Sequence, residues 1–350
     1  CHVRVLLPEL RPGAVDPDFF TGTVSQGDVL ALAADGTDFW LGGEFRSING
    51  LPRPYLARVG AGGGPAPGFN PGSGPDGQVN SIAVHGNGIL AGGDFQSVNG
   101  RVARGLVRLD RNGRLFPPDA SPADRLAAFS GTDGPVRFVL ALPGGNIVIA
   151  GGFATVNDRP AAGMALLSPD GSMAPGFTPP SCNGEVRTVV RLSDGTLLLG
   201  GNFTSLRLRL LRIHAVTGVE VPFPGGHAAP DGEVRALAVQ RDGGIVIGGE
   251  FIRLFGVDRK YLGRLLPGGA LDSDFRANVT GTLVSGLPPR IYALQTDAAG
   301  RILAGGNFTA VKGSPRPGLV RLLPSGAVDS AFMPPVFSRA SSAPSITATA

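Results

Sequence analysis

A short motif recurs six times along this 350-residue chain: an apolar run ends in a small-residue doublet, one variable residue and a phenylalanine. The six phenylalanines are separated by 50, 58, 50, 48 and 57 residues; they are Phe45, Phe95, Phe153, Phe203, Phe251 and Phe308. A period of roughly 40 to 50 residues built from short strands is typical of propeller blades and not of helical solenoids. The motif therefore predicts an all-β fold, a β-propeller.

The composition fits a packed repeat fold. Glycine (55) and proline (31) are abundant, but the glycines stand at fixed offsets within the repeats, and 42% of the residues are hydrophobic. Such a chain is long enough for one large all-β domain. No apolar run reaches the roughly 18 residues that a membrane span requires. We therefore expect no membrane span, and a ring that is soluble or tethered from outside this segment.

The charge does not indicate a nucleic-acid partner. The net charge is +4 and the sequence pI is about 9.6, but Lys260 and Lys312 are the only lysines among 31 basic residues. Nucleic-acid surfaces usually cluster both basic residue types, whereas these residues are spread along the repeats. The two cysteines, Cys1 and Cys182, are too few for a disulfide framework or a zinc site. Cys1 could be a lipidated terminus or a fragment boundary; we favour a boundary, within a longer chain.

The fifth repeat shows how one blade is built. Residues 234–239 alternate as a first strand, Asp242 and Gly243 form a turn, and residues 245–247 lead into the glycine doublet. Residues 261–265 and 270–275 supply two more strands, so the repeat predicts a four-stranded blade. A glycine near the hub lets the backbone of the neighbouring blade approach closely. The motif phenylalanine would then pack between blades.

The whole chain reads as one propeller domain over residues 1–340, followed by a tail or the start of another strand at 341–350. Complete repeats span residues 29–69, 79–119, 136–177, 186–223, 234–275 and 291–332. An orphan strand pair precedes them at residues 3–19. Closing the ring with both termini leaves no open sheet edge. This predicts six complete blades and an incomplete seventh in a monomeric ring; six blades with redundant ends is the alternative.

The repeat resembles a known family. The pattern Gly-Gly-x-Phe, x-Leu-x-Arg-Leu, Asp-x-x-Phe and Val-x-Ala-Leu is clearest from Val234 to Phe275. It is similar to the delta-60 repeat, a bacterial β-propeller family of unknown function, and distantly to kelch repeats. The resemblance implies a secreted or cell-surface protein. It carries over no catalytic residue.

Two charged columns supply the candidate ligand-binding residues. One column precedes the motif phenylalanine and the other lies eight residues after it; the candidates are Glu44, Arg53, Asp94, Glu250, Arg259 and Arg316. Read as a site, they form a ring of carboxylates and guanidiniums that could hold a sugar, a carboxylate or a metal ion. Read as structure, Glu44 pairs with Arg53 and Glu250 with Arg259, and each pair fastens one loop. The sequence favours the second interpretation.

Two further columns have structural interpretations. The arginines of the third strand are expected to donate hydrogen bonds to carbonyl groups of the neighbouring sheet; they are Arg4, Arg58, Arg108, Arg212, Arg264 and Arg321. The acids of Asp-x-x-Phe, namely Asp16, Asp272 and Asp329, are expected to cap local turns.

No enzyme template fits. The four histidines lack metal-ligand spacing, and we expect no metal and no cofactor. His227 beside Asp231 is the best acid–base candidate, while His85 lies in a turn on the opposite face. The sequence thus predicts a non-catalytic secreted or cell-surface scaffold that binds a protein or glycan. The alternative is a glycan-active hydrolase or lyase with carboxylates at the channel mouth.

Overall fold

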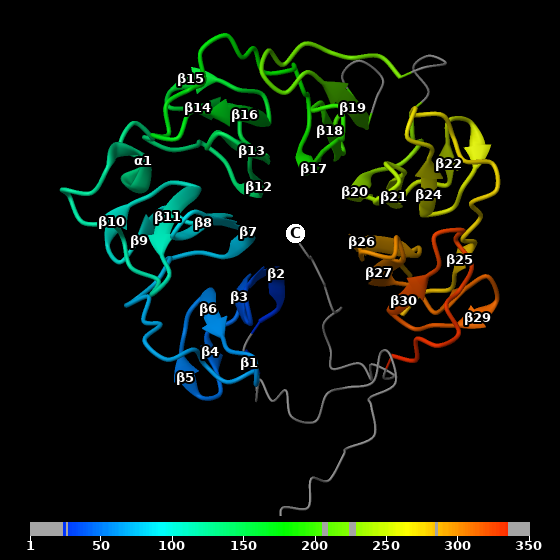
Figure 1. The fold of residues 1–350 in the computed structure, drawn as a ribbon, viewed down its shortest axis with the longest axis horizontal. Helices are drawn as coiled ribbons and strands as arrows, with labels where there is room; N and C mark the ends of the chain where they lie inside the picture. Colours follow the sequence, from blue (N-terminus) through cyan, green and yellow to red (C-terminus); the bar gives the residue numbers. More distant parts are fainter. Residues whose placement is uncertain (1–23, 26, 205–208, 224–228, 284–285, 335–350) are drawn as a thin grey trace, which may run out of the picture.

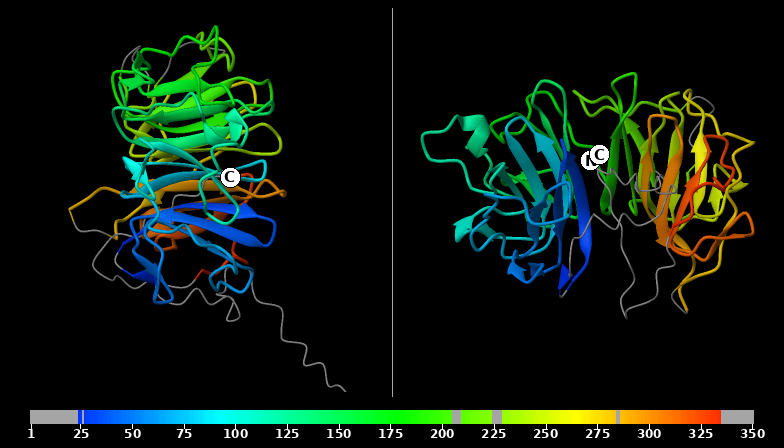
Figure 2. Two further views of the ribbon diagram at one scale, coloured as in Figure 1. Left: turned by 90° about the vertical axis from the view of Figure 1, so that its left-hand side faces the viewer. Right: turned by 60° about the horizontal axis from the view of Figure 1, so that its bottom comes forward.

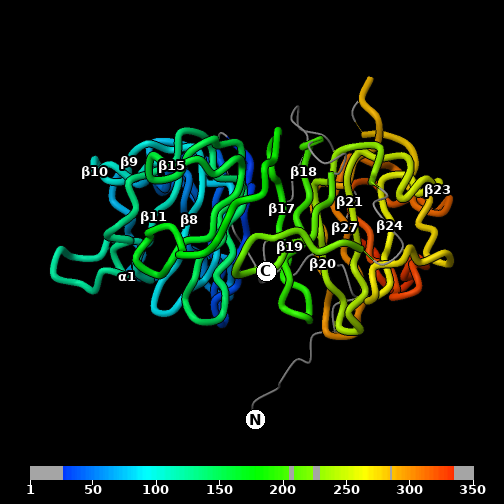
Figure 3. Tube along the Cα trace, turned by 90° about the horizontal axis from the view of Figure 1, so that it is seen from above, coloured from blue at the N-terminus to red at the C-terminus, as the bar shows by residue number. Residues whose placement is uncertain are grey.

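The computed structural model describes residues 24–25, 27–204, 209–223, 229–283 and 286–334. Six antiparallel three-stranded sheets stand around a central axis (Figure 1), and the edge-on views show a ring about one strand length thick (Figures 2 and 3). Each sheet has an inner, a middle and an outer strand. In chain order these are β2 (Val29–Asp35), β3 (Asp38–Gly43) and β6 (Leu56–Val59); β7 (Val79–His85), β8 (Gly88–Gly93) and β11 (Leu106–Asp110); β12 (Val136–Ala141), β13 (Ile147–Gly151) and β16 (Met164–Leu167); β17 (Val186–Arg191), β18 (Leu197–Gly201) and β19 (Leu210–Ile213); β20 (Val234–Val239), β21 (Ile245–Gly249) and β24 (Leu262–Leu265); β26 (Arg290–Thr296), β27 (Ile302–Asn307) and β30 (Leu319–Leu322).

The predicted fourth strand is wrong in the described repeats. After each outer strand the chain makes a single antiparallel bridge, such as Leu265 to Leu271, and no further ladder. In the fifth repeat the Asp272 carboxylate accepts hydrogen bonds from the backbone N–H groups of Asp274 and Phe275, at 3.0 and 3.2 Å. This local turn takes the chain away from the sheet, because its amide groups bond to the aspartate instead of a neighbouring strand.

The loops between middle and outer strands fold into small hairpins that the sequence analysis did not predict. They are β4 (Ser47–Ile48) with β5 (Leu51–Pro52), β9 (Ser97–Val98) with β10 (Arg101–Val102), β14 (Thr155–Val156) with β15 (Arg159–Pro160), β22 (Arg253–Leu254) with β23 (Val257–Asp258), and β28 (Ala310–Val311) with β29 (Ser314–Pro315). β1 (Val24–Ser25) and β25 (Val279–Thr280) add a third strand to two of them. In the first hairpin both turn residues, Asn49 and Gly50, have positive φ (52° and 73°), as two-residue hairpin turns favour.

The glycine doublet has two different packing roles. A Cβ on the first glycine would meet the neighbouring blade: it would lie 2.6 Å from Val79 Cγ1 at Gly42, and 2.6 Å from Ile291 Cγ2 at Gly248. This confirms the predicted close approach between blades. The second glycine instead faces its own blade, where a Cβ on Gly249 would lie 2.0 Å from the carbonyl oxygen of Glu233.

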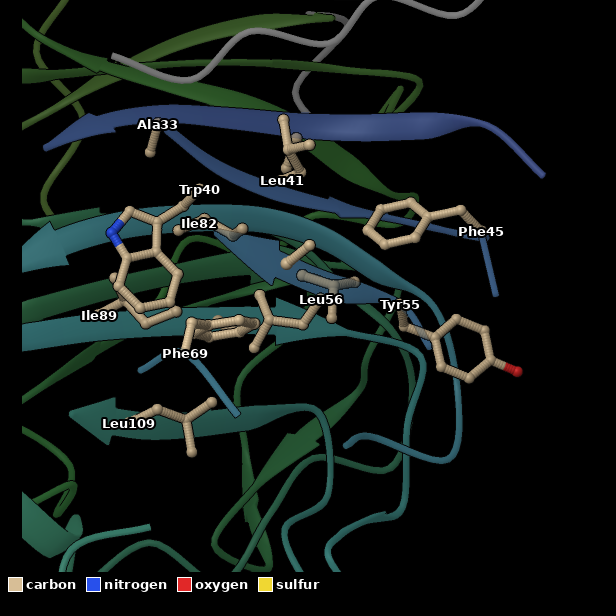
Figure 4. Close-up of a cluster of buried hydrophobic side chains, with 14 of the residues drawn as sticks. Ala33, Trp40, Leu41, Phe45, Tyr55, Leu56, Phe69, Ile82, Ile89 and Leu109 are labelled. Atoms are coloured by element: carbon tan, nitrogen blue, oxygen red, sulfur yellow. The ribbon is translucent and has the colours of Figure 1, made fainter. Parts of the chain in front are cut away.

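The core lies between blades and along the middle strands. All six motif phenylalanines are buried, with at most 3% of their surface exposed. In the first blade Trp40 packs edge-on against Phe69, with ring centroids 5.5 Å apart, and Ile82 of the next blade reaches the same cluster (Figure 4). The only α-helix of the described residues is the four-residue α1 (Pro122–Arg125), and none of their helices could cross a membrane.

The orphan residues 3–19, including Arg4 and Asp16, and the tail 341–350 lie outside the described residues. Neighbouring inner strands contact each other in chain order from β2 round to β26. The described part of the ring therefore contains six blade sheets besides the small outer hairpins, and each blade sheet has its inner strand facing the channel (Figure 1).

Candidate ligand site at the channel mouth

A β-bulge occurs at the same place in the inner strand of every described blade. In β20, Val234 pairs with Gly249 but Ala236 already pairs with Gly248, so Arg235 is the extra residue. Bulges redirect a side chain, and they are frequent beside functional sites. The six bulged residues line one cavity of about 440 Å³; they are Leu30, Asn80, Arg137, Arg187, Arg235 and Tyr292.

The arginines that line this cavity alternate with glutamates in a continuous chain of ion pairs across four blades. In order the chain runs Arg137, Glu185, Arg187, Glu233, Arg235, Glu250, Arg290. Glu185 is bonded by Arg137 Nε at 2.6 Å and by Arg187 Nη2 at 2.8 Å. Glu233 is bonded by Arg187 Nε and, at 2.9 Å, by Arg235 Nη2. Each of these two carboxylates therefore joins two neighbouring blades.

Glu250 completes the chain from the end of β21. Its Oε1 accepts a hydrogen bond from Arg235 Nε at 2.6 Å and lies 3.3 Å from Arg290 Nε. The Arg235 guanidinium also lies over the ring of Tyr292, 5.6 Å from its centroid. This is the cation–π geometry that orients a guanidinium.

Gln78 extends the polar chain toward the first blade. In the orientation of its side-chain amide that satisfies both neighbours, the Gln78 nitrogen donates a hydrogen bond to Glu44 Oε1 at 2.7 Å, and the Gln78 oxygen accepts one from Arg137 Nη1 at 3.1 Å. Asp28 also lines the cavity. Among the residues that line the cavity, the carboxylates thus belong to the first blade and the guanidiniums to the third to sixth blades.

The chain is partly shielded from water. Its seven side chains expose between 14% and 28% of their surface. Partial burial and shared partners make such a network more rigid than isolated surface pairs, which contribute only about 0–1 kcal/mol each. Each guanidinium is consequently held in one orientation at the mouth.

A second cavity, of about 290 Å³, continues the channel on the other side of the arginines of the mouth. It shares Arg137, Arg187, Arg235 and Tyr292 with the mouth. Below them its lining is mainly apolar and includes Phe138, Leu140, Val190, Ala238 and Val239. The channel therefore has a charged mouth above an apolar section.

The structure separates the six predicted site residues into two groups. Glu44 lines the mouth, and Glu250 binds two arginines that line it. Glu44 and Asp94 also line an adjoining open pocket with Arg46 and Tyr55. The three arginines are elsewhere.

Those three arginines bond to backbone carbonyl groups of their own blades. Arg259, only 5% exposed, donates to the carbonyl oxygens of Asp258, Asp272 and Ser273 at 2.8–3.3 Å. Arg53 donates to Pro52 and Phe69, and Arg316 to Pro315. The expected pairs Glu44–Arg53 and Glu250–Arg259 are not among the ion pairs of the described residues, because these guanidiniums fasten loops through carbonyl groups.

The third-strand arginines mostly bind carboxylates, which corrects the expectation of carbonyl partners. Arg264 binds Asp272 at 2.7 Å and Asp242, and Arg321 binds Asp329 at 2.8 Å. Arg212 likewise binds Asp194, and Arg58 binds Asp38 at 3.0 Å, while Arg58 and Arg108 also donate to the carbonyl groups of Arg111 and Ala123. These arginines tie the hairpin turn or the Asp-x-x-Phe turn to the outer strand.

The turn-capping role of the Asp-x-x-Phe acids is confirmed at both described positions. Asp329 Oδ1 accepts from the backbone N–H of Ala331 at 3.0 Å, as Asp272 does in its own turn. Burial alone would raise the pKa of Asp329, but its hydrogen bonds from Arg321 and Ala331 outweigh this effect and hold the pKa below its ordinary value.

The acid–base candidate receives no support. Asp231 accepts hydrogen bonds from the backbone N–H groups of Ile252 and Arg253, each at 2.8 Å, and so joins two loops. His227 lies outside the described residues. His85 ends β7, and burial, together with the nearby Arg108, lowers its pKa. Among the described residues no three His, Cys, Asp or Glu side chains converge as a metal site.

The sequence analysis did not single out the bulged residues of the inner strands as candidate site residues. The signal was present as Val-Arg at the start of three inner strands, with Glu before it in two: Val136-Arg137, Glu185-Val186-Arg187 and Glu233-Val234-Arg235. The simple alternation of side chains along a strand gave no reason to distinguish these arginines from the other residues of the inner strands. Only the bulge turns them into the channel.

Comparison with known proteins agrees with this architecture. Four segments, residues 87–115, 143–177, 240–275 and 300–332, match a β-propeller domain of unknown function, DUF5122. Each match runs from the turn before a middle strand to the segment after the outer strand. The fold and these matches define the chain as a β-propeller protein. Its repeats are similar to the DUF5122 domain.

No protein of curated function matches the chain by sequence. Among solved structures, the extracellular domain of a B. thetaiotaomicron protein described as a hybrid two-component system is 15% identical (TM-score 0.52). The match covers 87% of this chain but only 34% of that one. The WD40 propeller domain of Doa1 is 15% identical (TM-score 0.46; 83% and 76% covered), and the designed protein Ika8 is 12% identical (TM-score 0.47; 89% and 98% covered). At these identities the likeness concerns the fold alone.

Proposed function

We propose that this protein is a non-catalytic, secreted or cell-surface scaffold that binds a protein or glycan ligand at the mouth of its central channel. The observation that supports this most is the Arg–Glu chain, in which four blades place guanidiniums around one cavity of about 440 Å³. Binding sites in rigid scaffolds are typically concave, with a few well-held polar groups. No comparable observation favours the glycan-active enzyme.

The finer points of the architecture are also proposals. We infer that the repeats are of the delta-60 type and that residues 3–19 and 345–350 contribute to an incomplete seventh blade. The four-segment DUF5122 match supports the repeat unit. A variant lacking residues 1–20 should melt at a clearly lower temperature if these residues close the ring; an unchanged melting temperature would contradict the closure.

The function is tested by probing glycan and peptide arrays with the purified protein. We expect retention of a ligand that mass spectrometry recovers intact. The double variant Arg187→Gln, Arg235→Gln should lose retention while keeping its fold. The matched control is Arg253→Gln, which removes an exposed ion pair with Asp258 on the outer hairpin of the fifth blade. Retention of nothing on either array, or recovery of a cleaved ligand, would overturn the proposal.

A further inference from the structure

We propose that the ligand is an apolar monocarboxylate, with its carboxylate on Arg187 and Arg235 and its apolar part in the channel below. This inference rests on the proposed binding function and names its ligand class. It follows from three features of the channel: free guanidinium donors, an apolar section beneath them, and carboxylates on the opposite wall.

The first feature is a pair of fixed guanidiniums with spare donors. Arg187 and Arg235 each use Nε and Nη2 to bind two glutamates, and Glu233 lies between them as a shared partner. Among the described residues, Nη1 of each has no partner, and both arginines line the mouth and the channel. Because the guanidiniums are already held in place, a carboxylate would bind them with little loss of side-chain entropy.

The second feature is the apolar channel section directly beneath. Leu140, Val190 and Val239 are only half-buried, so they present apolar surface to the cavity of about 290 Å³. A ligand that binds Arg187 and Arg235 reaches this section, because both cavities share those arginines. Water released from apolar walls favours a ligand with an apolar group next to its carboxylate.

The third feature limits the ligand to one negative charge. Asp28 and Glu44 line the same mouth, and β2 stands across the channel from β17 in Figure 1. A second anionic group would therefore meet carboxylates, and such like-charge contacts are costly. On the wall formed by the third to sixth blades, the chain of ion pairs has four arginines and three glutamates, so the surplus on that wall is one positive charge, which faces the carboxylates of Asp28 and Glu44. Polyuronates and nucleic acids do not fit this arrangement.

An apolar monocarboxylate can be the C-terminus of a peptide that ends in an apolar residue, or a free apolar acid. Isothermal titration with acetyl-Gly-Gly-Leu and with octanoate distinguishes these sources. At least one should bind, and the C-terminal amide of the peptide, or octanamide, should bind at least tenfold more weakly. Loss of a charge-assisted contact has this order of effect.

Two variants test the contacts of the carboxylate and of the apolar part of the ligand separately. Arg235→Lys keeps the positive charge but loses the fork of donors, and it should weaken binding of every carboxylate probe at least fivefold. Val190→Asn should weaken acetyl-Gly-Gly-Leu or octanoate but leave acetyl-Gly-Gly-Gly unchanged. Arg253→Gln serves as the control and should leave every affinity unchanged. Melting temperatures report whether each variant folds.

Equal binding of acid and amide, tighter binding of a hexauronate, or no binding of either carboxylate probe would overturn this inference. If the arrays retain a neutral glycan while both carboxylates fail, the ligand class is wrong and the binding function stands. If the arrays retain nothing and the carboxylates fail too, the proposed function falls with it.

Discussion

The carbonyl oxygen of Glu233 lies 2.0 Å from the position that a Cβ of Gly249 would occupy. The same contact recurs at the second glycine of the other motifs, with the carbonyl group of the residue two positions before the bulged residue: Asp28 at Gly43, Gln78 at Gly93, Pro135 at Gly151, Glu185 at Gly201 and Arg290 at Gly306. Of these residues, Asp28, Gln78 and Arg290 line the channel mouth, and Glu185 and Glu233 bind arginines that line it. The glycine doublet therefore permits both the packing of blades and the backbone geometry of the site.

Gly249→Ala should destabilise the protein by about 1–3 kcal/mol, since the new methyl group meets backbone atoms that cannot rotate away. Urea denaturation provides the measurement. Gly268→Ala is the control, because a Cβ there meets nothing within 4 Å. Equal unfolding free energies for the two variants would show that the close contact has no energetic role.

Arg259→Ala should lower the unfolding free energy by about 1–3 kcal/mol, because three backbone carbonyl groups lose their donor. Binding at the channel mouth should not change. Thermal melting and ligand titration on the same sample measure both effects. Unchanged stability combined with lost binding would instead assign Arg259 to the ligand site.

Stability should fall in acid partly through Asp329. Although burial alone would raise it, hydrogen bonds hold the folded-state pKa of Asp329 below its ordinary value of 3.8. Its stabilising contribution is therefore complete above that value and is lost as the pH falls toward the folded-state pKa. Asp329→Asn should be less stable than the wild type at pH 7, and the difference should shrink below pH 4. The exposed Asp274→Asn is the control, and a difference independent of pH would contradict the argument.

Cys182 should be unreactive in the folded protein. It is 9% exposed, and burial raises the pKa of its thiol to about 12. The thiolate is the reactive form, so at pH 8 only about 0.01% of this thiol would be ionised. In a Cys1→Ser background, reaction with Ellman's reagent should be slow in buffer and fast in 6 M guanidinium chloride. Fast labelling of the folded chain would disprove the burial.

Local patterns predicted much of each blade because they depend on neighbours in the chain. The strand at 234–239 and the glycine doublet were placed correctly, as were the buried phenylalanines and the Asp-x-x-Phe turns. The fourth strand failed for a reason that is also local. Its apolar alternation suggested a ladder, but the side chain of Asp272 captures the amide groups that a ladder would need.

The candidate site shows the limit of this reasoning. Glu44 lines the channel mouth and Glu250 binds arginines that line it, although a role of either residue in ligand binding stays a prediction. Arg259 was matched to Glu250 by spacing alone. Spacing cannot tell which direction a long side chain takes when carbonyl groups and carboxylates are both within reach. Arg235, the actual partner of Glu250, was overlooked.

The sequence by itself determined the class of fold, because a repeated motif must bury the same apolar surface in every copy and a ring of sheets does so. Only the tertiary structure decided the site. The ion pairs join residues such as Arg187 and Glu233, which are 46 positions apart and come from different blades. Their contact depends on a bulge that turns one residue of each inner strand into the channel, which each blade repeats, and on how neighbouring sheets are packed, which no single repeat contains.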